Sequence, residues 1–255
     1  MRTRWRAGLA AFLAGALAAS VARADPRDDF LSGRSQACRG CDLAGVNFKR
    51  RDLSGADLTG ANLRDANLHD AQLGGARLAG ADLTRANLNK ANLVRADLHG
   101  AVLHDAMLYA ATLDDANLAG AELTGALMGT AKMTRSDLTR ANLRDADLRK
   151  ARFAETILTG ADLSAAALDL AFVRGARLDA AIMKGARLIG TRLVDTNLTG
   201  ADLTGANLLG ATLRGVNLTG ANLAGANFLK STMQATRIDD AVFGNTTMSD
   251  GTVRP

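Results

Sequence analysis

The chain has 255 residues, of which 47% are hydrophobic but only 4% aromatic, so its core must be built from aliphatic side chains. It carries 31 Lys and Arg residues against 26 Asp and Glu residues. Four of the basic residues lie within positions 1–24, and the remainder is close to neutral, which leaves no charge argument for a nucleic-acid partner.

Residues 1–24 have the pattern of a secretory signal peptide. Three arginines between positions 2 and 6 precede an apolar run over residues 7–21, and Ala22-Arg23-Ala24 supplies the small residues of a cleavage site. The run is shorter than the ~20 residues of a membrane span, although an uncleaved anchor is the alternative. We therefore expect an exported chain beginning at Asp25, periplasmic or secreted, without a membrane span.

The sequence of residues 25–40 predicts a cap at the N-terminal end of the region that begins at residue 41. Asp25 is a favourable N-cap and Pro26 a favourable first helical residue, so we expect a short helix over Pro26–Leu31 that ends before Gly33. Such a helix would cover an otherwise open strand edge. Arg51, which comes soon after at a position where other units have a small residue, is expected to turn outward.

Two cysteines close the cap region as Cys38-Arg39-Gly40-Cys41. In an oxidising compartment this pair suggests a disulfide that staples the first turn of the structure. Buried free thiols are the alternative. A thioredoxin-like redox site is disfavoured because it expects a βαβ context, and a metal site because further ligands are missing nearby.

From Cys41 to Val253 the chain consists of 43 consecutive units of five residues, written A-[D/N]-L-x-x, without insertion or deletion. The central residue is apolar in all 43 units and Leu in 31. A five-residue period leaves no apolar stripe on a helix, and in an extended chain it requires one corner in each unit. We place this corner two residues after the central one, where 18 of the 26 glycines fall.

This repeat resembles the pentapeptide-repeat family. The resemblance covers Cys41 to Val253 and implies an all-β fold over residues 41–255. This fold is a right-handed, four-sided parallel β-helix with four units per coil and hence 10–11 coils, in which residues 20 apart stack. The segment Asn245–Gly251 is similar to a terminal segment of the family, and we interpret it as a frayed last coil.

Three sets of outward residues are candidate contact surfaces. Ile189, Leu209 and Leu229 follow central residues on successive coils and predict an uncovered apolar strip, a candidate partner or homodimer contact. In the irregular middle of the array, apolar residues replace Asp or Asn at Leu127, Ile157, Phe172 and Ile182. A basic column contains Lys132, Arg152 and Arg192, with Arg174 and Arg214 beside it.

The sequence offers little for catalysis. His69, His99 and His104 lie on three sides of the expected rod; His99 and His104 with Asp105 are at best a weak metal site, and solvated side chains are the simpler interpretation. Nucleotide-binding, hydrolase and zinc-protease motifs are absent. We expect a non-enzyme without metal or cofactor.

The leading hypothesis is an exported scaffold that binds a protein or envelope partner through one flat face. An alternative implied by the resemblance is a DNA mimic that protects type II topoisomerase. Export and near-neutral charge disfavour it, because mimicry requires a dense negative surface. A second alternative is binding of an anionic polymer or nucleic acid through the basic column, although we expect no nucleic-acid partner.

Overall fold

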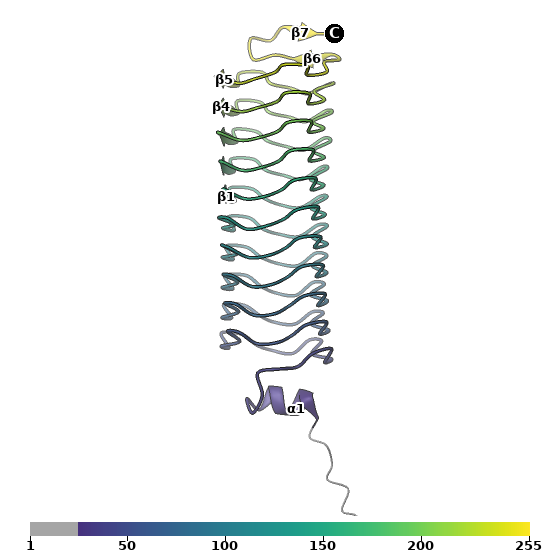
Figure 1. Cartoon of the computed structure of the whole chain (residues 1–255), viewed down its shortest axis with the longest axis vertical. Coiled ribbons are helices and arrows are strands. Elements are labelled where there is room, and N and C mark those ends of the chain that lie inside the picture. The colour runs from purple at the N-terminus through teal and green to yellow at the C-terminus, as the bar shows by residue number, and fades with distance from the viewer. Residues whose placement is uncertain (1–24) are drawn as a thin grey trace, which may run out of the picture.

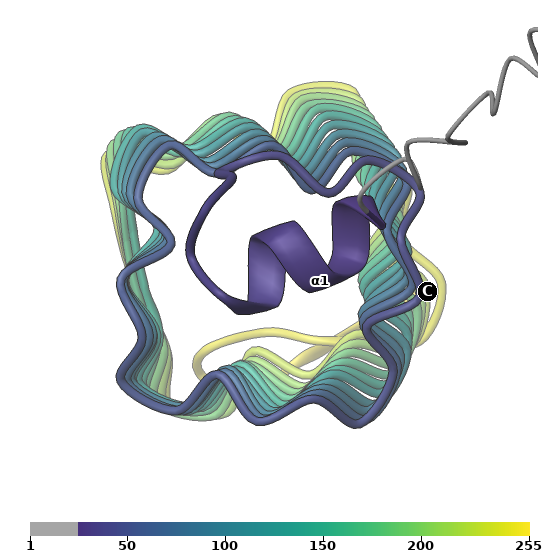
Figure 2. The same cartoon turned by 90° about the horizontal axis from the view of Figure 1, so that it is seen from below.

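The computed structural model describes residues 25–255, so the expected signal peptide lies outside the described residues. The chain forms a rod of stacked coils (Figure 1) that is four-sided when viewed along its axis (Figure 2). Parallel bridges join residues 20 apart, from Ala37 with Asp57 to Asn227 with Thr247. This spacing amounts to about ten and a half coils and confirms the predicted four-sided parallel β-helix.

The core consists of two side chains from each unit. The central residues from Leu43 to Phe228 are buried, and so are the small residues two positions earlier from Ala56 to Ser231. Where Thr replaces Ala, its hydroxyl is paired: Thr156 donates to the carbonyl of Met133 at 2.6 Å. The polar substitutions in the irregular middle are therefore tolerated in a dry core because their hydrogen bonds are made.

Each unit turns a corner at the predicted place. From Gly45 to Asn245, the residue two after the central one has a positive φ in every unit, whether it is a glycine such as Gly125 (φ 68) or another residue. Backbone N–H groups at the corner donate to the coil above, as Gly125 does to the carbonyl of Arg144 at 2.9 Å. The odd period is thus accommodated by one left-handed residue in each unit.

Continuous strands occur on one side of the rod, where β1–β5 form a parallel sheet in chain order. On the other sides, single bridges replace strands. A separate antiparallel pair, β6 with β7, closes the C-terminal end. The strands are β1 (Arg152–Ala154), β2 (Phe172–Arg174), β3 (Arg192–Val194), β4 (Thr212–Arg214), β5 (Thr232–Gln234), β6 (Thr246–Thr247) and β7 (Val253–Arg254).

The predicted helix α1 (Pro26–Leu31) is present and lies across the open end of the first coil (Figure 2). Asp25 accepts a hydrogen bond from the Arg27 backbone N–H at 2.9 Å, which caps the helix N-terminus. Phe30 is buried against Phe48, with ring centroids 5.9 Å apart. Across residues 25–255, no helix has the length and apolar character needed to cross a membrane.

The expectation for Arg51 was wrong. Its side chain turns toward the cap, where Nη2 donates to the carbonyl of Phe30 at 2.7 Å. Its guanidinium also lies 5.5 Å and 5.4 Å from the ring centroids of Phe30 and Phe48. The position admits a long side chain because no lower coil fills the space, and the Phe30 carbonyl, which already accepts the Gly33 backbone N–H at 3.1 Å, has a second lone pair for the guanidinium.

The C-terminal end also differs from the expected frayed coil. β7 folds back on β6, and the Arg254 guanidinium lies 4.7 Å from the centroid of the Phe243 ring. Met233, Ile238 and Phe243 nevertheless remain only partly buried, since no further coil covers them. The strand edge of the last full coil is therefore paired, but its core side chains are more exposed to solvent than those of the preceding coils.

Candidate binding groove

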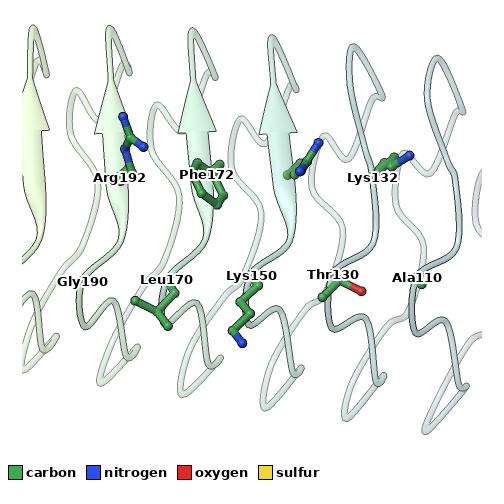
Figure 3. A pocket seen from close by; sticks show the side chains of 9 residues that line it. Ala110, Thr130, Lys132, Lys150, Leu170, Phe172, Gly190 and Arg192 are labelled. Carbon is green, nitrogen blue, oxygen red and sulfur yellow. The ribbon is translucent and has the colours of Figure 1, made fainter.

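A groove of about 710 Å³ runs along the middle coils of the rod (Figure 3). Outward residues of β1, β2, β3 and the coil before them form one wall, and corner residues two positions earlier form the other. Because residues 20 apart stack, each wall is a column parallel to the rod axis. We call this feature the basic groove, lined by Ala110, Thr130, Lys132, Lys150, Arg152, Leu170, Phe172, Gly190 and Arg192.

Positive charge dominates the basic groove. Its lining, within the described residues, contains four positive side chains and no carboxylate: Lys132, Lys150, Arg152 and Arg192. None of these four forms an ion pair within residues 25–255, whereas Arg85, for example, pairs with Asp65 of the adjacent coil at 2.7 Å. Unpaired charges of one sign in a concave surface attract a ligand of the opposite sign.

Leu170 and Phe172 form an apolar centre in this charged lining. They are 51% and 44% exposed, respectively. The Arg192 guanidinium lies over the Phe172 ring, 5.4 Å from its centroid, which is a favourable cation–π geometry. Leu170 occupies a corner with φ +59, the left-handed conformation that the corner residues of the array share, and differs from them in its large, exposed apolar side chain.

A second depression, of about 230 Å³, adjoins the basic groove and shares Thr130 and Lys150 with it. Tyr109 lines it and is 54% exposed, with its ring against Gly129, where an added Cβ would lie 3.3 Å from Tyr109 Cδ2. Within residues 25–255, Tyr109 and Phe172 are the only strongly exposed aromatic side chains. Exposed aromatic residues beside arginines are typical of binding hot spots.

The carboxylate in this second depression does not cancel the positive charge. Asp147 accepts hydrogen bonds from Arg149 at 2.8 Å and 2.6 Å. The bond from Arg149 holds the pKa of Asp147 below its usual 3.8, although partial burial opposes ionisation. Asp147 and Arg149 are thus a self-contained pair, and Lys150 beside them stays available to a ligand.

The sequence predicted one wall of the groove and missed the other. The sequence predicts Lys132, Arg152 and Arg192 as a basic column and Phe172 as an outward apolar residue, but its period does not connect Lys150 and Leu170 with them. These two residues belong to the preceding units, at the corner position. The available signal was Leu170 itself, a bulky apolar residue where glycine or a polar residue is usual in this chain.

The predicted apolar strip is less exposed than expected. Ile189, Leu209 and Leu229 are in register on successive coils, and each is only half-buried rather than uncovered. Gly190 does not leave the strip open, because Leu170 Cδ2 lies 2.9 Å from the point that its Cβ would occupy. The larger exposed apolar side chains, Leu170 and Phe172, lie in the basic groove instead.

Cys38 and Cys41 are joined by a disulfide, with their Cα atoms 5.3 Å apart. Cys38 is fully buried and Cys41 partly buried, directly beside the cap. Cys38 Sγ also lies 3.7 Å from the carbonyl oxygen of Pro26, at the start of α1. The bond therefore ties the first unit of the array at the point where the helix docks.

The histidines do not assemble a site. His99 Nδ1 lies 2.8 Å from Asp97 Oδ1. Partial burial opposes ionisation of Asp97, but hydrogen bonds from His99 and Asn117 outweigh it and lower the pKa of that carboxyl. Within residues 25–255, no group of three or more His, Cys, Asp or Glu side chains is placed to hold a metal ion.

Comparison with known proteins identifies the repeat. The family model described as pentapeptide repeats matches the chain in 8 copies, which together span residues 41–250. The chain has no match among curated proteins.

Solved structures with the same architecture include HetL, a pentapeptide repeat protein involved in heterocyst differentiation regulation in the cyanobacterium Nostoc. It is 32% identical, with a TM-score of 0.71, and the alignment covers 89% of this chain and 97% of HetL. A pentapeptide repeat protein from the Arabidopsis thaliana thylakoid lumen is 28% identical over 46% of this chain and 72% of its own length (TM-score 0.29). QnrB1, a plasmid-mediated fluoroquinolone resistance protein, is 16% identical over 82% of this chain and 91% of its own (TM-score 0.37).

Proposed function

Because the chain belongs to the pentapeptide-repeat family, we propose that it is a non-catalytic, exported rod that binds a protein or envelope partner through the basic groove. The observation that carries this proposal is the groove itself, which combines two exposed apolar side chains with four cations that form no ion pair within residues 25–255. Binding sites commonly combine a charged rim with apolar anchors.

The architecture supports binding rather than catalysis. Every unit between residues 41 and 253 has five residues, so no inserted loop brings acid, base and nucleophile together. The rigid stack instead presents side chains in fixed columns, which lowers the ordering cost of binding. The involvement of HetL in heterocyst differentiation regulation is compatible with such a role.

Two features support export. The first 24 residues have the charge and hydropathy pattern of a cleaved leader. The Cys38–Cys41 disulfide is of a kind that persists in oxidising compartments. Mass spectrometry of the mature protein tests this part of the proposal. A chain that begins at Asp25 agrees with it, and a mature pool that retains Met1 contradicts it.

The charge distribution does not favour a DNA mimic. From residue 25 onward the chain has 27 basic and 26 acidic residues, and the basic groove is positive. A mimic needs closely spaced negative charge along its surface. If the mature protein restored DNA supercoiling that a quinolone had inhibited, the DNA-mimic function would be favoured over the scaffold.

Capture experiments with matched variants test the groove. The double variant Lys150→Glu/Arg152→Glu reverses two of its charges, whereas Lys90→Glu/Lys230→Glu makes the same change in net charge on the corner column outside the groove. We expect that an envelope partner crosslinks to the parent protein and to Lys90→Glu/Lys230→Glu. The same partner should be lost from Lys150→Glu/Arg152→Glu. Equal recovery with both variants would exclude the groove as the contact surface.

A further inference from the structure

We propose that the basic groove binds an extended acidic peptide segment that carries an apolar side chain between its acidic residues. This inference rests on the proposed function and specifies its partner: the ligand is a polypeptide, recognised through one short linear segment. It follows from three features of the groove: the order of its side chains along the rod, its length, and the stacking of the Arg192 guanidinium on the Phe172 ring.

Chemical character changes from coil to coil along the groove (Figure 3). The coil with Lys132 and the next one, with Lys150 and Arg152, are positive. The following coil presents Leu170 and Phe172, and the one after it presents Arg192 beside Gly190. A complementary ligand therefore has two or three negative groups, then an apolar group, then another negative group.

An extended peptide fits these dimensions. From the coil of Ala110 to the coil of Gly190 the groove crosses four coil spacings, or about 19 Å at the ~4.8 Å separation of neighbouring strands. An extended chain advances about 3.3 Å per residue, so about six residues fill this length. Alternate side chains would point into the groove, in the manner of strand-like peptide ligands.

The ligand must be recognised through side chains. The strands below the groove are already paired on both edges, because β2 lies between β1 and β3 in the parallel sheet. No backbone edge is free there to accept an added strand. Arg152 and Arg192 can each grip a carboxylate with two hydrogen bonds, while Lys132 and Lys150 act as point charges.

The apolar centre distinguishes this ligand from a uniform polyanion. The coil with Leu170 and Phe172 contributes no cation to the groove, so a phosphate or sugar acid at that level would meet an apolar surface. The Arg192 guanidinium covers one face of the Phe172 ring, at 5.4 Å from the centroid, which leaves at most one face for a stacked nucleobase. A peptide with an aliphatic side chain at this level places an apolar group against this apolar surface.

Fluorescence anisotropy with synthetic peptides and the full-length mature protein provides the test. The probes are labelled Asp-Glu-Asp-Leu-Leu-Glu and its reverse sequence, since the structure does not set the chain direction. A charge-only peptide has both leucines replaced by serine, and a rearranged peptide has them at its ends. A thymidine 12-mer serves as the nucleic-acid probe.

We expect one of the two ordered peptides to bind at least about tenfold more tightly than the charge-only and rearranged peptides. Lys150→Glu should weaken this binding about tenfold or more, while Lys90→Glu, at the same corner position but outside the groove, should not. Phe172→Ser should abolish the preference for leucine, whereas Ile182→Ser, at the same position of a unit on another side, should preserve it.

Three results would overturn the inference: equal binding of all acidic peptides, tighter binding of the thymidine 12-mer, or no peptide binding at millimolar concentration. In each case the capture experiment above separates the two proposals. A partner that still depends on Lys150 and Arg152 would keep the groove as a binding surface but require a ligand other than a linear acidic peptide.

Discussion

Arg51 Nη2 donates a hydrogen bond of 2.7 Å to the carbonyl oxygen of Phe30, and so joins the first coil of the array to the C-terminal turn of α1. Since this contact is charged and partly buried, it is worth roughly 1.5–3 kcal/mol. We predict that Arg51→Ala undocks the helix without unfolding the rod. Amide hydrogen exchange should rise in residues 26–31 and remain low in the array.

Arg95→Ala is the matched control for this change, because Arg95 is an exposed arginine of the same side of the rod without an ion pair in the described residues. It should leave exchange in α1 unchanged. Exchange that rises throughout the array in Arg51→Ala would show that the cap and the rod unfold as one unit.

The Cys38–Cys41 disulfide closes a very short loop, so its effect through chain entropy is modest, about 2 kcal/mol. We predict that Cys38→Ala/Cys41→Ala loosens the first coil and the docked helix, since in a repeat array each coil is stabilised mainly by its neighbours. Limited proteolysis should cut the variant before about residue 45 and leave the rest intact. Resistance equal to that of the parent would show that the disulfide is dispensable for cap docking.

The fold was predictable because one position repeats in every unit. The central residues, such as Leu143, and the small residues two before them have a spacing that only a chain with one corner per unit can bury. The contacts at the capped end of the rod were less predictable. Arg51 occupies an inward position, and only the helix beneath it explains why a long charged side chain fits there.

The candidate site was predictable only in part, because it combines two positions of the repeat that belong to different units. Arg152 and Phe172 are outward residues of strands, and their column follows directly from the period of 20. Lys150 and Leu170 lie at corners, and their approach to that column depends on how sharply each corner turns. Register alone does not contain this information.

A charge in the core should destroy the cooperative stability of the array. Leu143 is fully buried, so Leu143→Asp loses roughly 1.5–3 kcal/mol of side-chain burial and adds a buried carboxylate that costs several kcal/mol more. We predict a large fall in melting temperature, measured by circular dichroism. Ala119→Asp, at an outward position where other units already carry Asp, should melt close to the parent. Similar melting of both variants would refute the inward register.

Acid should destabilise the rod through a recurring aspartate motif. Asp82, Asp162 and Asp202 each accept a hydrogen bond from the backbone N–H two residues later and pair with a cation 18 residues earlier. Partial burial opposes ionisation, but these bonds outweigh it, and the pKa of each carboxyl lies below its usual 3.8.

The sign of the effect follows from these lowered pKa values. Each carboxylate is more easily ionised in the folded chain, so its contribution is fully present above pH 3.8 and is lost as the pH falls through the lower folded pKa. We predict a melting temperature that is constant from pH 7 to pH 5 and falls below pH 4. In Asp202→Asn, which cannot ionise, the fall should be smaller. A melting temperature that rises on acidification would contradict this account.

The last prediction concerns self-association through the strip of Ile189, Leu209 and Leu229. Their half-exposed side chains are in register on three successive coils, an arrangement that a second copy could match through two-fold symmetry. Leu209→Lys places a charge at the centre of this strip. The fold should tolerate it, because the same position of other units already carries a cation, as at Lys184. Light scattering at high protein concentration should show a dimer for the parent and a mass close to that of the monomer for Leu209→Lys, whereas Arg152→Glu in the basic groove should leave the dimer intact.

A dimer that survives Leu209→Lys must use another surface, of which the partly covered C-terminal coil around Phe243 is the strongest candidate. A parent that is monomeric at every concentration would limit the strip to contacts with a different protein.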